Sequence, residues 1–138
     1  MKPTVFIVDD ETLLLRTLSN ALRDEGYEVF SAQSVEGGAS VLSELEQDVD
    51  VMVLDVKLPD RSGLDLLEEQ RTGGYVGPVI VMTAFDSPDS ERRCRQLSVD
   101  SYLRKPFDLD AMLGLIRDLV EGNGIGSSAN GNGTRAEY

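Results

Sequence analysis

Three aspartates and one lysine stand directly after short apolar runs, where charged groups can act together. Asp9 and Asp10 follow the first run, Asp55 closes a second, and Lys105-Pro106 follows a third, weaker one. In open parallel sheets, ligands bind at the carboxyl ends of the strands. If the runs are such strands, these charges converge although they are distant in sequence. The pattern predicts a site for a metal ion and a phosphoryl group.

Magnesium is the metal ion that these residue types favour. Clustered carboxylates repel one another, which raises a carboxyl pKa unless a cation neutralises the cluster. The chain contains no histidine and a single cysteine, Cys94, so oxygen atoms are the ligands it can offer. Mg2+ prefers oxygen ligands and shares its coordination with phosphoryl oxygens. Alone, Asp9 and Asp10 could simply cap a helix, whose dipole favours acids; together with Asp55 and Lys105 they favour the metal site.

The other polar residues of the pattern each have a chemical and a structural interpretation. Asp55 could be a carboxylate nucleophile that forms an acyl phosphate, or a turn residue at a strand end. Thr83 could donate a hydroxyl hydrogen bond to a phosphoryl oxygen, or only favour a strand. Lys105 could hold the phosphoryl charge, pair with Asp55, or be a solvated surface charge. Because they occur together, we favour the chemical interpretation.

The composition is that of one acidic domain. With 138 residues, of which 41% are hydrophobic, the chain can bury a single core. Its formal net charge of -12 disfavours direct binding to nucleic acid or to anionic membranes. Without histidine, Ser-His and Cys-His catalysis is excluded, and no apolar stretch approaches the roughly 18 residues of a membrane span. With one cysteine and hence no intramolecular disulfide, we expect a cytoplasmic protein.

Strand-like and helix-like segments alternate along the first 121 residues. Length and periodicity predict strands over 5–8, 27–32, 49–54, 79–82 and 100–103. They predict helices over 12–25, 35–47, about 64–70, 87–97 and 109–119. Gly37-Gly38 weakens the second helix, and Ser87-Pro88 is typical of a helix start with an N-cap serine. The apolar stripe of the first helix is formed by Leu14, Leu18, Ala21 and Leu22.

Five successive βα units predict an α/β fold, a doubly wound (βα)5 sandwich. Right-handed crossovers make the sheet parallel and cover both of its faces with helices. The expected strand order is 2-1-3-4-5, with a switch point between the first and third strands. Asp9, Asp10 and Asp55 would face one another across that crevice. Residues 122–138, rich in glycine, asparagine and serine, are expected to be a flexible tail or linker.

In these positions the chain resembles the receiver domain of two-component response regulators, a flavodoxin-like phosphoacceptor family. The resemblance covers residues 4 to about 121. Val8–Glu11 resembles the acidic pair of the family, and Leu54–Leu64 resembles its phosphorylation loop. Val81–Ala84 resembles the segment with its switch threonine, and Tyr102–Phe107 its switch aromatic and Lys-Pro-Phe motif. The resemblance makes residues 1–121 a receiver domain.

For the site, the resemblance implies that Asp55 is phosphorylated by a sensor histidine kinase or a phosphotransfer protein. Asp10, Asp55 and the backbone carbonyl of Lys57 would bind Mg2+. Asp9 would lie close by and reach the ion directly or through water. The absence of histidine agrees with this assignment, because the phosphoryl donor must then be another protein.

For signalling, the resemblance implies a switch and no enzyme beyond the domain's own phosphorylation and dephosphorylation. Thr83 and Lys105 would hold the phosphoryl group, and Tyr102 would respond by moving inward. That movement would change the surface of the fourth helix, fifth strand and fifth helix, through which the domain could bind an effector or a second copy. Neither nucleic acid nor membrane is an expected partner.

Two other functions remain open at this point. An aspartyl-phosphate phosphatase of the haloacid-dehalogenase type also uses an aspartate nucleophile and Mg2+, but requires an acid where this chain has Lys57. A protein-interaction module on the same fold would work without phosphorylation. A flavin-binding flavodoxin is disfavoured because the first loop lacks a phosphate cradle rich in serine, threonine and glycine.

One helix departs from the pattern of the family. Ser98 ends the fourth helix where the family usually has glycine, so a left-handed cap would be strained there. The segment Ser87–Leu97 also has few apolar residues. We therefore predict that this helix is mobile or displaced, and that its amides are less protected from hydrogen exchange than those of the first helix.

Overall fold

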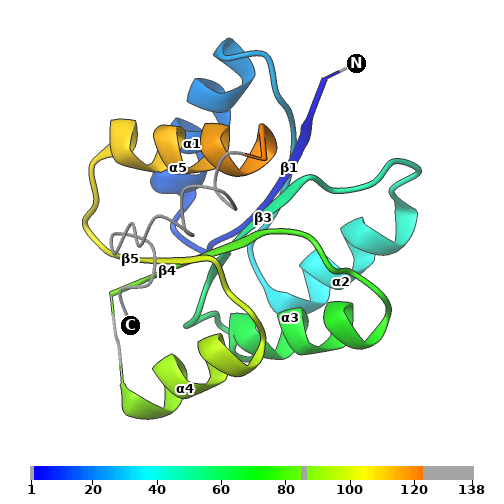
Figure 1. The fold of residues 1–138 in the computed structure, drawn as a ribbon, viewed down its shortest axis with the longest axis vertical. Coiled ribbons are helices and arrows are strands. Elements are labelled where there is room, and N and C mark those ends of the chain that lie inside the picture. The colour runs from blue at the N-terminus through cyan, green and yellow to red at the C-terminus, as the bar shows by residue number, and fades with distance from the viewer. Residues whose placement is uncertain (1, 85–86, 123–138) are drawn as a thin grey trace.

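The computed structural model describes residues 2–84 and 87–122, so the predicted tail lies outside the described residues except for Gly122. In these residues five strands alternate with five helices (Figure 1). The strands are β1 (Thr4–Val8), β2 (Glu28–Ala32), β3 (Val51–Asp55), β4 (Val79–Thr83) and β5 (Ser101–Arg104). The helices are α1 (Thr12–Asp24), α2 (Val35–Glu44), α3 (Gly63–Thr72), α4 (Pro88–Gln96) and α5 (Leu109–Val120).

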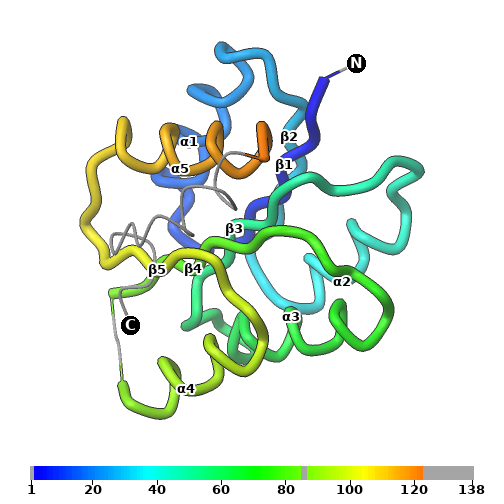
Figure 2. The backbone as a smooth tube through the Cα atoms, in the orientation of Figure 1, coloured from blue at the N-terminus to red at the C-terminus, as the bar shows by residue number. Residues whose placement is uncertain are grey.

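The sheet has the predicted topology. Its strands are all parallel and lie in the order β2-β1-β3-β4-β5. Figure 2 shows β1 between β2 and β3, and Val5 lies opposite Val29 on one side and Val51 on the other. The chain therefore leaves β1 first toward one edge of the sheet and later returns to its other side. The switch point lies between the carboxyl ends of β1 and β3.

Helices cover both faces of the sheet, α1 and α5 on one and α2, α3 and α4 on the other (Figure 1). Every residue of β1, β3 and β4 is buried, which explains their continuous apolar runs. Along β1 the side chains alternate between two cores. Val5 and Ile7 pack in the core under α1 and α5, and Phe6 and Val8 pack in the core under the other three helices.

The buried face of α1 differs from the predicted stripe. Leu18 and Leu22 are buried as expected, but Leu15 and Ser19 complete the face in place of Leu14 and Ala21, which are only partly buried. The sequence offers three consecutive leucines at 13–15, so its period does not decide between neighbouring positions. Leu13, the first of the three, is 73% exposed.

The second helix is shorter than predicted, ending at Glu44 where the expected end was Gln47. Leu45 is already extended, with ψ at 137°. Gly38, expected only to weaken this helix, has a packing role. A Cβ built there would lie 3.0 Å from Leu66 and 3.3 Å from Phe6. The glycine thus lets α2 lie close to the sheet and α3.

The fourth helix begins and ends as predicted. The Ser87 hydroxyl accepts a hydrogen bond from the Ser90 N–H at 3.1 Å, and Pro88 opens the helix. Ser98, just past the end, has φ at 60°, in the left-handed region. Cys94 is the buried residue of this helix. The predicted mobility of the helix stays a prediction.

Candidate functional site

The three predicted acids meet at the carboxyl edge of the sheet. Asp9 and Asp10 follow β1, and Asp55 is the last residue of β3. Each offers a carboxylate oxygen, and these oxygens all lie within 4.8 Å of one another. Asp9 is 0% and Asp55 4% exposed, whereas Asp10 is exposed. The convergence predicted from the strand order is confirmed.

Lys105 lies between these acids. Its Nζ is 2.7 Å from Asp9 Oδ2 and 2.9 Å from Asp55 Oδ2, and its side chain is 8% exposed. The backbone N–H of Lys105 donates to Thr83 O at 2.8 Å, which fixes the lysine next to the end of β4. Its peptide bond to Pro106 is cis. The surface-charge interpretation of Lys105 is therefore wrong, and its predicted pairing with Asp55 is present.

Burial and pairing act in opposite directions on the ionisation of this cluster. Burial raises the pKa of Asp9 above its ordinary value, and the hydrogen bond from Lys105 lowers it in part. Burial likewise raises the pKa of Asp55, with a further rise from the charge of Asp9. For Lys105, burial disfavours the charge, but hydrogen bonds to the two acids raise its pKa above the ordinary value. The ammonium thus stays charged between carboxylates that gain from any nearby cation.

The two neighbouring aspartates have different surroundings. Asp9 lies beneath the surface, where its Oδ1 accepts the Glu11 N–H at 2.8 Å and its Oδ2 contacts Lys105. Asp10 borders the open pocket above them. That pocket is lined by Asp10, Glu11, Asp55, Lys57, Leu58, Pro59, Ala84 and Lys105. A cation entering from solvent would meet Asp10 and Asp55 first, with Asp9 behind them. These oxygen donors fit Mg2+.

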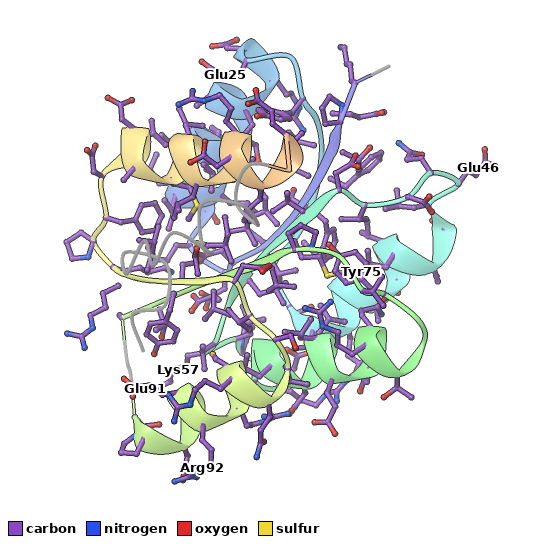
Figure 3. All side chains as sticks on the ribbon, viewed as in Figure 1. Glu25, Glu46, Lys57, Tyr75, Glu91 and Arg92 are labelled. Atoms are coloured by element: carbon purple, nitrogen blue, oxygen red, sulfur yellow. The ribbon has the colours of Figure 1, made fainter. Side chains whose placement is uncertain are left out.

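The loop after β3 is held close to Asp55. The Lys57 N–H donates to Asp55 Oδ1 at 3.3 Å, and Lys57 bridges to Ser62 across the loop. The Gly63 N–H donates to Val56 O at 2.8 Å, and a Cβ at Gly63 would overlap the carbonyl oxygen of Asp55. The side chain of Lys57 is exposed and lies to the left of Tyr75 in Figure 3. Lys57 is among the residues that line the pocket at Asp10 and Asp55, and the predicted role of its backbone carbonyl stays a prediction.

Thr83 and Tyr102 lie on neighbouring strands beside the acids. Thr83 is the last residue of β4 and is 0% exposed. Tyr102 is on β5, opposite Val81, and is 5% exposed within the core under α2, α3 and α4. Tyr102 is thus buried in this structure, and its predicted inward movement on phosphorylation stays a prediction. A switch at Tyr102 requires a second, outward position.

Glu11 is a part of the site to which the residue pattern assigned no role. Its Oε2 lies 3.2 Å from Lys105 Nζ, so the ammonium contacts three carboxylates. Glu11 is exposed at the rim, with 59% of its side chain accessible. The signal in the sequence was its position directly after Asp9 and Asp10.

Across the described parts of the chain, residues 2–84 and 87–122, every helix is too short or too polar to cross a bilayer.

Known proteins share both the sequence pattern and the fold. A family model described as the response regulator receiver domain matches residues 5–117. The chain is 36% identical over 122 residues to the probable transcriptional regulatory protein TcrX of Mycobacterium tuberculosis, covering 88% of this chain and 51% of that protein. The transcriptional regulatory protein PdtaR of the same organism is 35% identical over 109 residues, covering 79% of this chain and 52% of its own. The chain spans about half the length of these curated relatives.

Among solved structures, the crystal structure of a CheY-like response regulator receiver domain protein from Methanospirillum hungatei has the same fold. Its TM-score is 0.82 at 26% identity, and the likeness covers 88% of this chain and 96% of that one. The strand order and the acid-bearing edge of the sheet agree with this likeness. The phosphatase and flavodoxin alternatives are thereby set aside. The chain belongs to the receiver domain family of two-component response regulators.

Proposed function

We propose that Asp55 accepts a phosphoryl group from a phosphohistidine of a sensor histidine kinase or phosphotransfer protein, in a reaction that requires Mg2+. The observation that carries this proposal is the position of Lys105, whose Nζ lies 2.7 Å from Asp9 and 2.9 Å from Asp55. A buried ammonium between two carboxylates at the carboxyl edge of the sheet is suited to hold an incoming phosphoryl group. This chain has no histidine, so the phosphohistidine would lie outside these 138 residues.

In the proposed step, a carboxylate oxygen of Asp55 attacks phosphorus in line with the leaving imidazole nitrogen. The P–N bond breaks as the O–P bond forms, and the imidazole takes up a proton. Asp10, Asp55 and the Lys57 carbonyl would hold Mg2+, with Asp9 close by, and the ion would offset charge on the phosphoryl oxygens. Lys105 would exchange its contact with Asp55 for a phosphoryl oxygen.

The switch in this proposal connects Thr83 to Tyr102. Thr83 lies at the carboxyl end of β4, next to the end of β3 where Asp55 stands. A hydroxyl drawn toward the phosphoryl group would favour the inward Tyr102 over an outward one. A difference of about 1–3 kcal/mol between the two states changes their ratio roughly 5- to 150-fold. The surface of α4, β5 and α5 would transmit the change to an effector or a second copy.

An apolar pocket beside the acids supports docking of a protein donor. It is lined by Glu11, Leu14, Ala84, Lys105, Pro106 and Phe107. It shares Glu11, Ala84 and Lys105 with the pocket at Asp10, so the two form one continuous rim. Leu13 adds an exposed apolar side chain on the same helix as Leu14. A small phosphodonor would use the acidic pocket alone, whereas a protein donor would also cover the apolar one.

Incubation with MgCl2 and acetyl phosphate tests the proposal. The expected product is the protein with one added phosphate, seen by mass spectrometry of the intact chain. Asp55→Asn should abolish it, and so should chelation of Mg2+. Asp65→Asn, an acid on α3 that pairs with Arg93, should still be labelled. Labelling that persists in Asp55→Asn would contradict the assignment.

The buried position of Tyr102 also supports the second candidate, an interaction module that works without phosphorylation. If the inward arrangement is the dominant one at all times, a partner could recognise the α4, β5 and α5 surface constitutively. Partner affinity measured with and without phosphodonor separates the two functions. An affinity that does not change on phosphorylation of Asp55 favours the second.

A further inference from the structure

The loop between β3 and α3 makes a contact that the phosphorylation site does not by itself require. Asp60, at the outer end of this loop, reaches across to the start of α2. Its Oδ1 accepts the Val35 N–H and its Oδ2 accepts the Glu36 N–H, each at 2.9 Å. The two hydrogen bonds are charge-assisted, and they lower the pKa of Asp60 below its ordinary value.

The start of α2 is therefore capped from two directions. The first N–H groups of a helix have no partner within the helix and need one elsewhere. Asp60 accepts two of these N–H groups, and Ser34, the N-cap residue, accepts the Gly37 N–H at 2.9 Å. The caps serve the same helix end, but only Asp60 belongs to the phosphorylation loop. This division offers a matched pair of variants.

The turn between β2 and α2 also contacts the segment after β1, which carries Asp9 and Asp10. The Asp9 N–H donates to Ala32 O at 3.1 Å, at the beginning of that turn. Asp60 accepts the N–H groups at the end of the same turn, three and four residues after Ala32. The turn thus contacts both the segment after β1 and the loop after β3. These are the segments that carry Asp9, Asp10 and Lys57.

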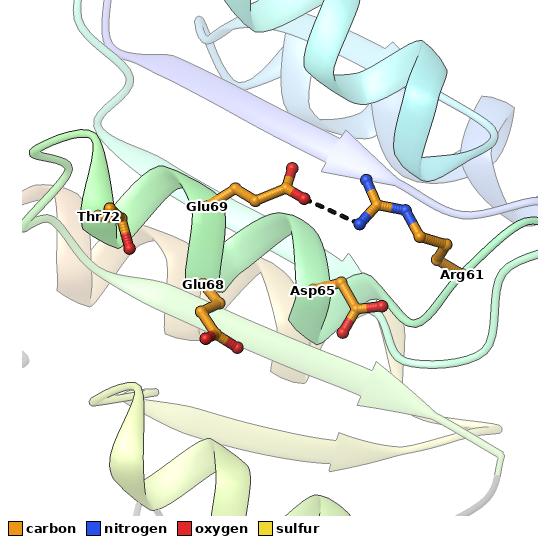
Figure 4. A pocket seen from close by; sticks show the side chains of 5 residues that line it. All are labelled: Arg61, Asp65, Glu68, Glu69 and Thr72. Carbon is orange, nitrogen blue, oxygen red and sulfur yellow. Dashed lines mark hydrogen bonds and ion pairs between the residues drawn. The ribbon is translucent and has the colours of Figure 1, made fainter.

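Other contacts of the loop do not replace that of Asp60. At its base, Lys57 bridges to Ser62. Near its outer end, Arg61 pairs with Glu69 at 2.8 Å and with Glu36 at 3.2 Å, and Figure 4 shows its guanidinium directed at Glu69. These pairs are solvent-accessible, with 49% and 72% of the glutamate side chains exposed, and such pairs contribute little. The backbone N–H groups that donate to the Asp60 carboxylate are more rigid partners than the glutamate side chains that pair with Arg61.

We propose that Asp60 is a positioning residue, which uses the β2–α2 turn as a brace to hold the β3–α3 loop, and with it the Lys57 carbonyl, at the spacing from Asp10 that Mg2+ needs. The inference rests on the proposed function, since the role of the Lys57 carbonyl belongs to it. Asp60 contacts neither the ion nor the phosphoryl group in this scheme. It acts on Lys57 through the backbone of the two residues between them, Leu58 and Pro59.

Mg2+ affinity, measured by isothermal titration calorimetry, tests the inference on three variants. Asp60→Ala should raise the Mg2+ dissociation constant by about tenfold, at the lower end of the range for residues that orient metal ligands. Asp60→Asn, which retains one acceptor oxygen, should recover part of the loss. Ser34→Ala weakens the same helix start from its other side and should leave the Mg2+ affinity within about twofold of wild type, because the loop keeps its brace.

Two further measurements distinguish positioning from a general loss of stability. In Mg2+-free buffer, the Gly63 amide, which bonds to Val56 O, should exchange hydrogen faster in Asp60→Ala and not in Ser34→Ala. Urea unfolding should show both variants destabilised. Equal Mg2+ affinity in Asp60→Ala and Ser34→Ala would overturn the positioning role and leave the phosphorylation site intact. A wild-type chain that fails to bind Mg2+ would overturn the proposed function, and the inference with it.

Discussion

Lys105 is the residue on which the electrostatics of this domain depend. Its ammonium contacts Asp9, Asp55 and Glu11, and the first two carboxylates are almost fully buried. A buried carboxylate without a counter-ion would take up a proton at neutral pH. The lysine therefore acts as an internal cation for the cluster. We expect that a divalent ion bound there would compete with it for carboxylate oxygens.

Replacing Lys105 with methionine should destabilise the Mg2+-free protein at pH 7 by about 3 kcal/mol, because two buried carboxylates lose their partner. The pKa values of Asp9 and Asp55 are already raised and should rise further in the variant. A raised carboxyl pKa means that the folded state binds more protons, so stability is lost as pH rises and regained as pH falls toward 4. Urea unfolding between pH 4 and 8 measures this.

The matching control is Lys2→Met, an exposed lysine at the other end of β1 from Asp9, which should change stability much less than Lys105→Met does. Adding MgCl2 should stabilise Lys105→Met more than wild type, because no ammonium competes for the carboxylates. Equal stabilisation of both proteins by Mg2+ would show that lysine and ion do not share oxygens.

Cys94 is a buried thiol whose ionisation is linked to folding. Burial raises its pKa from 9.0 to about 11. Between these values the unfolded chain has lost the thiol proton and the folded chain has kept it, so stability falls as pH rises. The loss should be on the order of 2 kcal/mol by pH 11. Cys94→Ala has no thiol and should lack this loss, so its free energy of unfolding should approach that of wild type as pH rises from 9 to about 11. A difference between the two proteins that stays constant over this range would contradict the assignment.

At the scale of elements, α4 is attached to the domain mainly by polar contacts. Arg93 pairs with Asp65 at 3.0 Å and with Glu68 at 2.8 Å on α3. At the other end, Arg71 of α3 donates from its guanidinium to Leu97 O at 2.9 Å and to Ser98 O at 3.1 Å. Since Cys94 is the one buried side chain of this helix, ion pairs carry much of its docking. Such docking is screened by salt, unlike apolar packing.

Hydrogen exchange should therefore be faster in α4 than in α1, and faster still in high salt. Arg93→Ala should raise the exchange rates of α4 amides about 2- to 5-fold at low salt, which corresponds to the strength of exposed ion pairs. Arg92→Ala is the matched control, because Arg92 pairs with Asp89 inside α4 at 2.6 Å and does not reach α3. Protection of α4 equal to that of α1 would refute the predicted mobility.

The elements also show where sequence patterns succeed and fail. Continuous apolar runs predicted β1, β3 and β4, because strands buried on both faces need such runs. Their order was predicted from the five successive βα units and the doubly wound topology. The convergence of Asp9, Asp10 and Asp55 followed from that order. The buried face of α1 was misplaced, because three adjacent leucines satisfy two neighbouring phases of a helix equally well. The bonds from α2 to Asp60 left no local pattern, since they join backbone N–H groups to a carboxylate distant in sequence.

The whole molecule combines a strongly acidic surface with an acidic crevice. The formal charge of -12 is distributed over 138 residues, and self-repulsion of this size destabilises the compact state. Salt of any kind should therefore stabilise the fold somewhat by screening. A bound divalent ion should add a specific effect, because the unfolded chain cannot bring the segments after β1 and β3 together. Screening by salt and specific binding of the ion can be separated by comparing buffers that contain different salts.

The free energy of unfolding, measured with urea in MgCl2 and in NaCl of equal ionic strength, separates specific binding of Mg2+ from general screening. At a Mg2+ concentration tenfold above its dissociation constant, the free energy of unfolding should exceed the NaCl value by about 1.4 kcal/mol. Asp10→Asn should lose this excess and keep the response to NaCl. Glu46→Gln, which removes an exposed acid at the far end of the sheet (Figure 3), should keep both. If Asp10→Asn and Glu46→Gln respond alike to Mg2+, the ion acts on the overall charge and not at the carboxyl ends of β1 and β3.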